Sequence, residues 1–169
     1  MAAYGAASKV DMIVALPILG LAGAAVSVVG MFAGAGRVDL VAGKGNNGGD
    51  GFVIARYLAE RHINVTVYLL AQAAKVKGDA AANLKRLAAL KIPLIEIPDE
   101  DSFSKIKSDL SCFGLLVDAI LGTGLTSDVR GFFKTVIDFI NDLNRNGIPV
   151  FAVDMPSGLN SDTGQPCGT

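Results

Sequence analysis

The chain has 169 residues, of which 51% are hydrophobic and 18% are charged, so it is long enough for one domain with a core that needs no disulfide or structural metal. Its net charge of -1, without a long run of one sign, excludes a nucleic-acid partner held through its phosphates. Cys112, Cys167 and His62 lack the spacing of a zinc site, which excludes a zinc enzyme of standard pattern.

The first element is an apolar segment, residues 12–36, that carries no charge and is long enough to cross a bilayer. Pro17 interrupts it, glycines are frequent in it, and no Trp or Tyr belt flanks it. We therefore expect residues 1–36 to form a helical segment packed on the domain, with a membrane span or an export signal as the alternatives. Two cysteines without a pattern suit a reducing compartment, so the expected location is cytoplasmic.

From residue 37 to residue 169, short β-branched runs alternate with longer stretches of helical periodicity. The runs predict strands at residues 38–42, 64–70, 93–97, 114–120 and 149–154. The longer stretches predict helices at residues 50–61, 77–90, 102–110 and 130–144. Strands that alternate with helices indicate an α/β domain with a mostly parallel central sheet, and ligands bind such sheets at the carboxyl ends of the strands.

A glycine-rich segment, residues 43–51, follows the first strand. It has few side chains, so its backbone amides can face an anionic ligand at the start of the next helix. Gly43, Gly45 and Gly48 match GxGxxG, but the second strand ends without the acidic residue that holds the ribose of NAD, and no Gly-Lys-Ser/Thr completes a P-loop. The segment is therefore either an anion cradle or only a tight turn before a helix.

Two carboxylates are expected near strand ends, Asp118 in the fourth strand and Asp154 in the fifth. An isolated aspartate at such a place is most simply a helix cap or a turn former. Beside glycine loops, in a partly desolvated crevice, the pair instead indicates general acid or base chemistry. Asn47, Asp118 and Ser157 together offer the all-oxygen ligands that a hard cation prefers, either a monovalent ion or Mg²⁺.

Four motifs follow one another in the chain: residues 45–51 read GNNGGDG, 78–83 read GDAAAN, 117–124 read VDAILGTG and 153–159 read VDMPSGL. In this order they resemble the NAD(P)H-hydrate epimerase family, the YjeF N-terminal domain. The resemblance implies a three-layer αβα Rossmann-like fold that interconverts the R and S epimers of NADHX and NADPHX, the hydrated forms of NADH and NADPH. It also implies a homodimer, and an ATP- or ADP-dependent NAD(P)HX dehydratase as functional partner or fused domain.

The resemblance further assigns site residues. Asp154 is implied as the acid/base residue, and the implied substrate-binding residues are Asn46, Asn47, Gly48, Gly49, Asp50, Gly122, Thr123, Gly124, Leu125, Thr126, Ser127, Asp128 and Asp154. One potassium ion per subunit is implied at Asn47, Asp118 and Ser157. NADPHX is then a substrate rather than a redox cofactor, which agrees with the missing ribose clamp.

Two departures from the family pattern stand out. Relatives usually carry Glu-Asn-Ala-Gly before the first strand, where residues 20–23 here read GLAG. Relatives also continue beyond the motif at 153–159, so we expect a core of residues 37–169 that lacks C-terminal strands, as a truncated domain or part of a bifunctional protein. A fold does not fix a function, so two alternatives remain. One is a non-catalytic dimerising scaffold or ligand-binding module, and the other is a phosphosugar or nucleotide enzyme with the same cradle.

Overall fold

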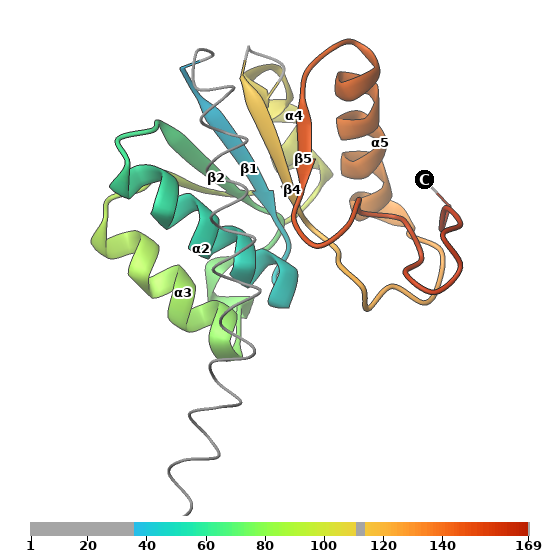
Figure 1. The fold of residues 1–169 in the computed structure, drawn as a ribbon, viewed down its shortest axis with the longest axis horizontal. Helices are drawn as coiled ribbons and strands as arrows, with labels where there is room; N and C mark the ends of the chain where they lie inside the picture. The colour runs from blue at the N-terminus through green and yellow to red at the C-terminus, as the bar shows by residue number, and fades with distance from the viewer. Residues whose placement is uncertain (1–35, 111–113, 169) are drawn as a thin grey trace, which may run out of the picture.

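The structure is a computed structural model that describes residues 36–110 and 114–168 (Figure 1). Strands and helices alternate along this part of the chain: β1 (Val38–Ala42), α2 (Asn46–Glu60), β2 (Val65–Leu69), a short 3-10 helix η2 (Ala73–Lys75), α3 (Gly78–Ala89), β3 (Leu94–Glu96), α4 (Glu100–Leu110), β4 (Leu115–Ala119), α5 (Gly131–Arg145) and β5 (Val150–Ala152). All five predicted strands and all four helices predicted from residue 37 onward are therefore present. The predicted helical segment 1–36 lies outside the described residues except for Gly36.

The five strands form one sheet in the order β3-β2-β1-β4-β5, and every pair of neighbours is parallel. This confirms the predicted α/β class, with a sheet that is wholly parallel among the described residues. The order is that of the Rossmann fold, in which the chain leaves β1 toward one edge and returns to β4 on the other side. The crevice between the carboxyl ends of β1 and β4 is the switch point at which such folds bind ligands.

Helices cover both faces of the sheet, as the prediction of three layers requires (Figure 1). α2 and α3 cover one face, where Phe52 and Leu58 pack with Leu40 in the first hydrophobic cluster. α4 and α5 cover the other face, where the second cluster includes Phe103 and Ile140. In β1, Val38, Leu40 and Ala42 belong to the first cluster and Val41 belongs to the second, so both faces of this buried strand are covered.

The largest difference from the predicted boundaries concerns α2, which begins at Asn46 rather than at residue 50. Gly45 is its N-cap, and the N–H of Gly49 donates to the carbonyl of Gly45 at 3.0 Å. The glycines that read as a loop are helical because the helix lies very close to its neighbours. A Cβ added at Gly48 would lie 1.9 Å from the carbonyl oxygen of Gly43, and one at Gly51 would lie 2.6 Å from the Cβ of Ala119.

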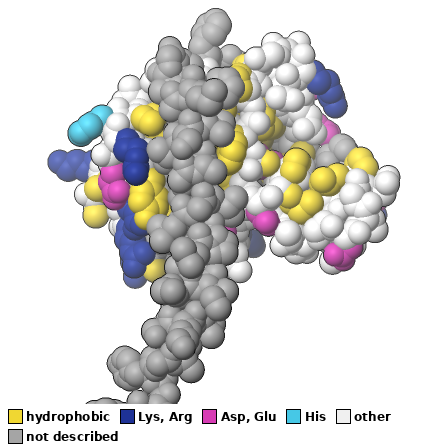
Figure 2. All heavy atoms as spheres, in the orientation of Figure 1, with side chains coloured by type: hydrophobic (Ala, Val, Ile, Leu, Met, Phe, Trp, Pro, Cys, Tyr) yellow, Lys and Arg dark blue, Asp and Glu magenta, His cyan; other side chains and the backbone are white. Residues whose placement is uncertain are grey.

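Figure 2 shows basic and acidic side chains lying among one another on the described part of one face, with small hydrophobic patches between them. Among residues 36–110 and 114–168 no helix is long and apolar enough to span a bilayer.

Candidate active site

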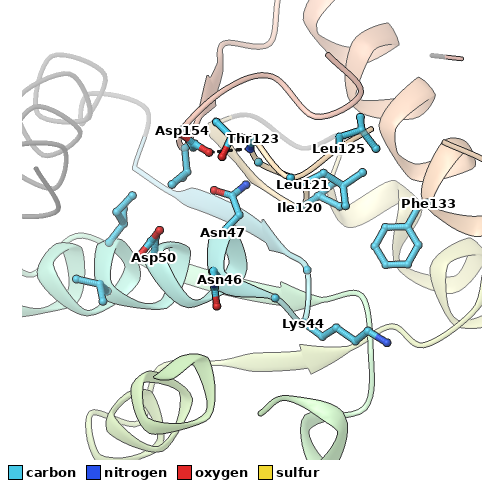
Figure 3. A pocket seen from close by; sticks show the side chains of 17 residues that line it. Lys44, Asn46, Asn47, Asp50, Ile120, Leu121, Thr123, Leu125, Phe133 and Asp154 are labelled. Carbon is cyan, nitrogen blue, oxygen red and sulfur yellow. Dashed lines mark hydrogen bonds between the residues drawn. The ribbon is translucent and has the colours of Figure 1, made fainter. Parts of the chain in front are cut away.

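A pocket of about 700 Å³ opens at the carboxyl ends of β1 and β4, at the switch point of the sheet (Figure 3). This volume lies within the range of small-molecule sites. Its walls come from the start of α2, the loop after β4, one residue of α5 and the end of β5. The lining residues are Gly43, Lys44, Gly45, Asn46, Asn47, Asp50, Val53, Ile54, Ile120, Leu121, Gly122, Thr123, Gly124, Leu125, Phe133, Val153 and Asp154.

The start of α2 presents backbone donors to this pocket. The first helical hydrogen bond is made by the N–H of Gly49, so the N–H groups of Asn46, Asn47 and Gly48 have no carbonyl partner within the helix. They lie at the positive end of the helix dipole, and the first turn contains no acidic residue. Three free amides at a helix start form a site for an anionic group such as a phosphate.

Asn47 is the least satisfied polar side chain of the pocket. Both its Oδ1 and its Nδ2 are buried and have no hydrogen-bond partner. The side chain lies against Gly122, where an added Cβ would be 3.4 Å from the Cβ and Cγ of Asn47. A buried amide without a partner costs free energy, so its presence in a pocket wall indicates a ligand that completes its coordination.

Asp118, in β4, is buried at 5% exposure behind the pocket wall. Its Oδ1 accepts hydrogen bonds from the N–H of Ile120 at 3.1 Å and from the hydroxyl of Ser157 at 2.6 Å. Its Oδ2 accepts from the N–H of Ser157 at 2.8 Å. Burial raises the pKa of the Asp118 carboxyl, although the hydrogen bonds from Ser157 and Ile120 oppose the rise. The structure therefore brings Asp118 and Ser157 into direct contact.

Ser157 also joins the two loops that follow β4 and β5. Its Oγ accepts a hydrogen bond from the N–H of Leu121 at 2.9 Å. Further along the same segment, the Asn160 amide donates to the carbonyl of Leu125 at 3.4 Å, and the Ser161 hydroxyl donates to the carbonyl of Thr123 at 3.1 Å. The segment after β5 thus supports the whole loop that forms one wall of the pocket.

Asp154 lies at the rim of the pocket, just beyond β5, and is exposed. Its backbone φ is 66°, in the left-handed region that a non-glycine residue rarely adopts. The N–H of Thr123 donates to its Oδ2 at 2.9 Å, and no hydrogen bond to its Oδ1 is present among the described residues. A strained backbone that holds one carboxylate oxygen free toward a pocket is a frequent feature of functional sites.

A second carboxylate, Asp50 of α2, lines the same pocket and is only half-exposed. Burial raises the pKa of the Asp50 carboxyl, and the negative charge of Asp154 raises it further. A carboxyl with a raised pKa keeps its proton to a higher pH, which suits a group that supplies a proton.

The pocket has an apolar side away from the two carboxylates. Figure 3 shows Ile120, Leu121, Leu125 and Phe133 on the side opposite Asp50. The Lys44 side chain, in the turn between β1 and α2, extends toward this same side in that view. The sequence patterns assigned neither Phe133 nor Lys44 to the site. The available signal was that Lys44 is the one charged residue within the glycine turn at 43–45.

The predicted site residues divide into three groups. Those that line the pocket are Asn46, Asn47, Asp50, Gly122, Thr123, Gly124, Leu125 and Asp154. Gly48 and Gly49 are buried, and they pack against Gly43 and Ala80 respectively. Thr126, Ser127 and Asp128 lie outside the lining, as do Asp118 and Ser157 behind the wall. No group of three or more His, Cys, Asp or Glu able to hold a metal occurs in the described part, so any cation site here must use amide and hydroxyl oxygens as well.

Comparisons with known proteins identify the family of this chain. The model of the family "YjeF-related protein N-terminus" matches residues 20–169. An NAD(P)H-hydrate epimerase of Oenococcus oeni is 40% identical over 133 residues, which cover 79% of this chain and 58% of that protein. A bifunctional NAD(P)H-hydrate repair enzyme Nnr of Thermofilum pendens is 39% identical over 144 residues, 85% of this chain and 26% of that protein.

Among solved structures, the crystal structure of yeast ynu0 is similar with a TM-score of 0.66 and 26% sequence identity. The similarity covers 85% of this chain and 62% of the yeast chain. This chain therefore spans only part of the length of the proteins it matches, from about a quarter of the bifunctional relative to somewhat more than half of the single-function relative.

Proposed function

The chain belongs to the family of YjeF-related protein N-termini, and from this premise we propose that it is an NAD(P)H-hydrate epimerase, an isomerase that interconverts the R and S forms of NADHX and NADPHX. The proposal rests on the position of Asp154. Its strained backbone holds a carboxylate with a free Oδ1 at the rim of the pocket, and the pocket lies at the switch point of a sheet with the strand order of dinucleotide-binding folds. The relatives that bear this name support the same activity.

In the proposed reaction Asp154 is the acid/base residue at the hydrated carbon of the nicotinamide ring. Its Oδ2 is held by the N–H of Thr123, so Oδ1 is the oxygen that exchanges a proton with the substrate. Asp50, with its raised pKa, provides the second carboxyl of the pair. Inversion at the hydrated carbon requires a bond from this carbon to oxygen or nitrogen to break and to form again on the opposite face. The two carboxyls can accept the proton that this step releases and return it when the bond forms again.

The substrate's pyrophosphate fits the free N–H groups of Asn46, Asn47 and Gly48 at the start of α2. This placement puts the nicotinamide end on the side of Asp154 and leaves the apolar side of the pocket for the rest of the molecule. Thr123 and Gly124 line the pocket wall that contains the Asp154 contact. Fixing the ring against the carboxylate supplies the orientation on which the rate depends.

Potassium is part of the proposal, as one ion per subunit held by Asn47, Asp118 and Ser157. The residues fit such an ion because they offer only oxygen ligands, and because the buried Oδ1 of Asn47 has no protein donor. When bound, the ion supplies a fixed positive charge between the start of α2 and the loops after β4 and β5.

We also propose a cytoplasmic homodimer that works with an ATP- or ADP-dependent NAD(P)HX dehydratase. Bifunctional relatives are described as NAD(P)H-hydrate repair enzymes, which supports a dehydratase as a fused domain or as a separate partner. Such a pair converts both epimers back to NADH or NADPH, because the epimerase feeds the form that the dehydratase accepts.

A coupled assay tests the proposed activity. A mixture of R and S NADHX is incubated with an S-specific dehydratase and its nucleotide, and NADH absorbance is followed with and without this chain. We expect recovery of NADH to pass the S fraction and to approach completion faster than spontaneous epimerisation allows. No acceleration by a chain whose fold is verified by circular dichroism would contradict the proposal. Binding of NADHX without turnover would then identify a ligand-binding module of the same fold.

A further inference from the structure

Lys44 is the one cationic side chain among the residues that line the pocket. It is exposed, and no ion pair of Lys44 occurs in the part of the chain that the structure describes. Asp50 and Asp154, the acidic lining residues, lie on the other side of the pocket in Figure 3. A free lysine at the mouth of a pocket is available to a negatively charged group of the ligand.

The order of groups along the pocket places this lysine relative to a dinucleotide. In the proposed reaction Asp154 acts at the nicotinamide ring, and the free amides of Asn46, Asn47 and Gly48 hold the pyrophosphate that comes next in the substrate. Lys44 directly precedes Gly45, the N-cap of α2, and its side chain extends away from Asp154 in Figure 3. It therefore lies beyond the pyrophosphate position, where the second ribose of the dinucleotide must follow.

The apolar side of the pocket fits the base attached to that ribose. Ile120, Leu121 and Leu125 form an apolar wall, and Phe133 of α5 adds an aromatic ring to it. The Phe133 ring is supported by Phe132, edge to face with 6.0 Å between the ring centroids. A planar apolar surface of this kind binds a purine through stacking and dispersion contacts.

Resting on the proposed function, we infer that Lys44 is a specificity-determining residue that pairs with the 2′-phosphate of the adenosine ribose and so favours NADPHX over NADHX. The adenine lies against Phe133 in this arrangement, and the pyrophosphate lies on the amides of α2.

The test uses the stable oxidised dinucleotides NAD⁺ and NADP⁺ as probes, titrated by calorimetry onto the full chain and its variants. We expect NADP⁺ to bind about tenfold more tightly than NAD⁺, as one charge-assisted contact allows. Lys44→Ala should remove this preference, because it should weaken the binding of NADP⁺ and change the dissociation constant of NAD⁺ by no more than about twofold. Lys44→Arg should keep the preference, and Lys85→Ala, which removes an exposed lysine of α3 away from the pocket, should change neither affinity.

A second variant tests the orientation of the ligand. Phe133→Leu keeps an apolar side chain but removes the aromatic ring, so it should weaken both dinucleotides to the same degree. Equal weakening of NAD⁺ and NADP⁺ in Lys44→Ala would overturn the inference, because Lys44 would then contact the pyrophosphate. Equal affinity of the unmodified chain for the two probes would overturn it as well.

The same variants separate this inference from the proposed function. Measurement of kcat/KM for NADHX and NADPHX should show a loss confined to NADPHX in Lys44→Ala. Epimerisation of both substrates with no such difference would sustain the proposed function and overturn the role of Lys44. Lysine-dependent preference for NADP⁺ without any epimerisation would sustain the role of Lys44 and contradict the proposed activity.

Discussion

Asp154 combines two properties that a mutation can separate: a left-handed backbone and a carboxylate with one free oxygen. Asn keeps the left-handed backbone conformation, since it tolerates positive φ about as well as Asp does. Its amide oxygen can also accept the hydrogen bond from the N–H of Thr123. Asp154→Asn therefore removes the proton carrier while it keeps the geometry of the loop.

We expect Asp154→Asn to lower kcat of epimerisation by about 100-fold or more, which is the usual contribution of a general acid or base. The free energy of unfolding of this variant should stay within about 0.5 kcal/mol of that of the unmodified chain, because the Asp154 side chain is exposed. Asp162→Asn, at an exposed position of the same segment, is the matched control and should leave kcat unchanged. Full activity in Asp154→Asn would remove Asp154 from the chemistry.

Asp50 illustrates how a site residue can lower stability. Burial and the charge of Asp154 raise the pKa of the Asp50 carboxyl, so the folded chain binds this proton more readily than the unfolded chain does. The ionised carboxylate therefore destabilises the fold at neutral pH. This effect disappears as the pH falls through the raised pKa toward the ordinary aspartate value of about 4, where the carboxyl is increasingly protonated in both states.

Asp50→Asn should accordingly raise the midpoint of thermal unfolding at pH 7 and give a much smaller gain near pH 4, measured by circular dichroism. The exposed residue Asp128 supplies the control, since Asp128→Asn should change the midpoint little at either pH. The opposite pattern, a loss at pH 7, would mean that Asp50 stabilises the fold through a contact of its ionised form. Activity of Asp50→Asn should fall at the same time, because stability and function conflict at this residue.

At the scale of the element, α2 shows why a glycine-rich sequence can form a helix. Helix propensity disfavours glycine, and the sequence predicts a helix only from residue 50, after Gly48 and Gly49. Here Gly48 lies against the backbone of Gly43, Gly49 lies against Ala80, and Gly51 lies against Ala119. The helix starts early because only residues without a Cβ allow it to approach β1, β4 and α3 so closely.

Gly48→Ala should destabilise the chain by about 1–3 kcal/mol or more, because its Cβ would overlap the carbonyl oxygen of Gly43 and neither backbone can move freely. Gly124→Ala is the matched control, since a Cβ there meets no atom within 4 Å. Urea denaturation of both variants measures the difference. Equal stability of the two would show that α2 does not pack as the structure has it.

The elements that could be predicted are those whose pattern depends on burial alone. The sequence predicts β1 at residues 38–42 and a helix at residues 130–144, because hydrophobic periodicity reports burial. The residues of α5 that the structure buries are Val136, Ile137, Ile140 and Leu143. The start of α2 depends on how closely two backbones approach, and the role of Phe133 depends on a pocket formed by segments far apart in the chain. Periodicity within a single segment contains neither kind of information.

At the scale of the whole molecule, the site depends on three elements that meet only through the topology. Asn47 comes from α2, Asp118 from β4, and Ser157 from the segment after β5. The order β3-β2-β1-β4-β5 places the ends of β1 and β4 side by side, so residues about seventy positions apart in sequence share one wall. A cation held by these three residues would bind only the folded chain and would therefore stabilise it.

Asn47 makes the proposed potassium site testable without any measurement of activity. Its amide is buried and forms no hydrogen bond to the protein, so Asn47→Ala removes an ion ligand and breaks no hydrogen bond of the fold. The free energy of unfolding is measured in potassium, at about ten times the dissociation constant, and in tetramethylammonium. For the unmodified chain it should be about 1.4 kcal/mol higher in potassium, and for Asn47→Ala it should be the same in both salts.

In tetramethylammonium alone, Asn47→Ala should be at least as stable as the unmodified chain, because a buried amide without a partner costs about 1–3 kcal/mol. The unmodified chain should therefore be the more stable of the two in potassium, and Asn47→Ala should be the more stable in tetramethylammonium. A simple loss of packing in the variant cannot produce this reversal. Asn46→Ala removes the neighbouring exposed amide at the same pocket and should keep the potassium response. If potassium still raised the free energy of unfolding of Asn47→Ala, the ion would bind elsewhere. The unpaired Asn47 amide would then be available to form hydrogen bonds with the substrate.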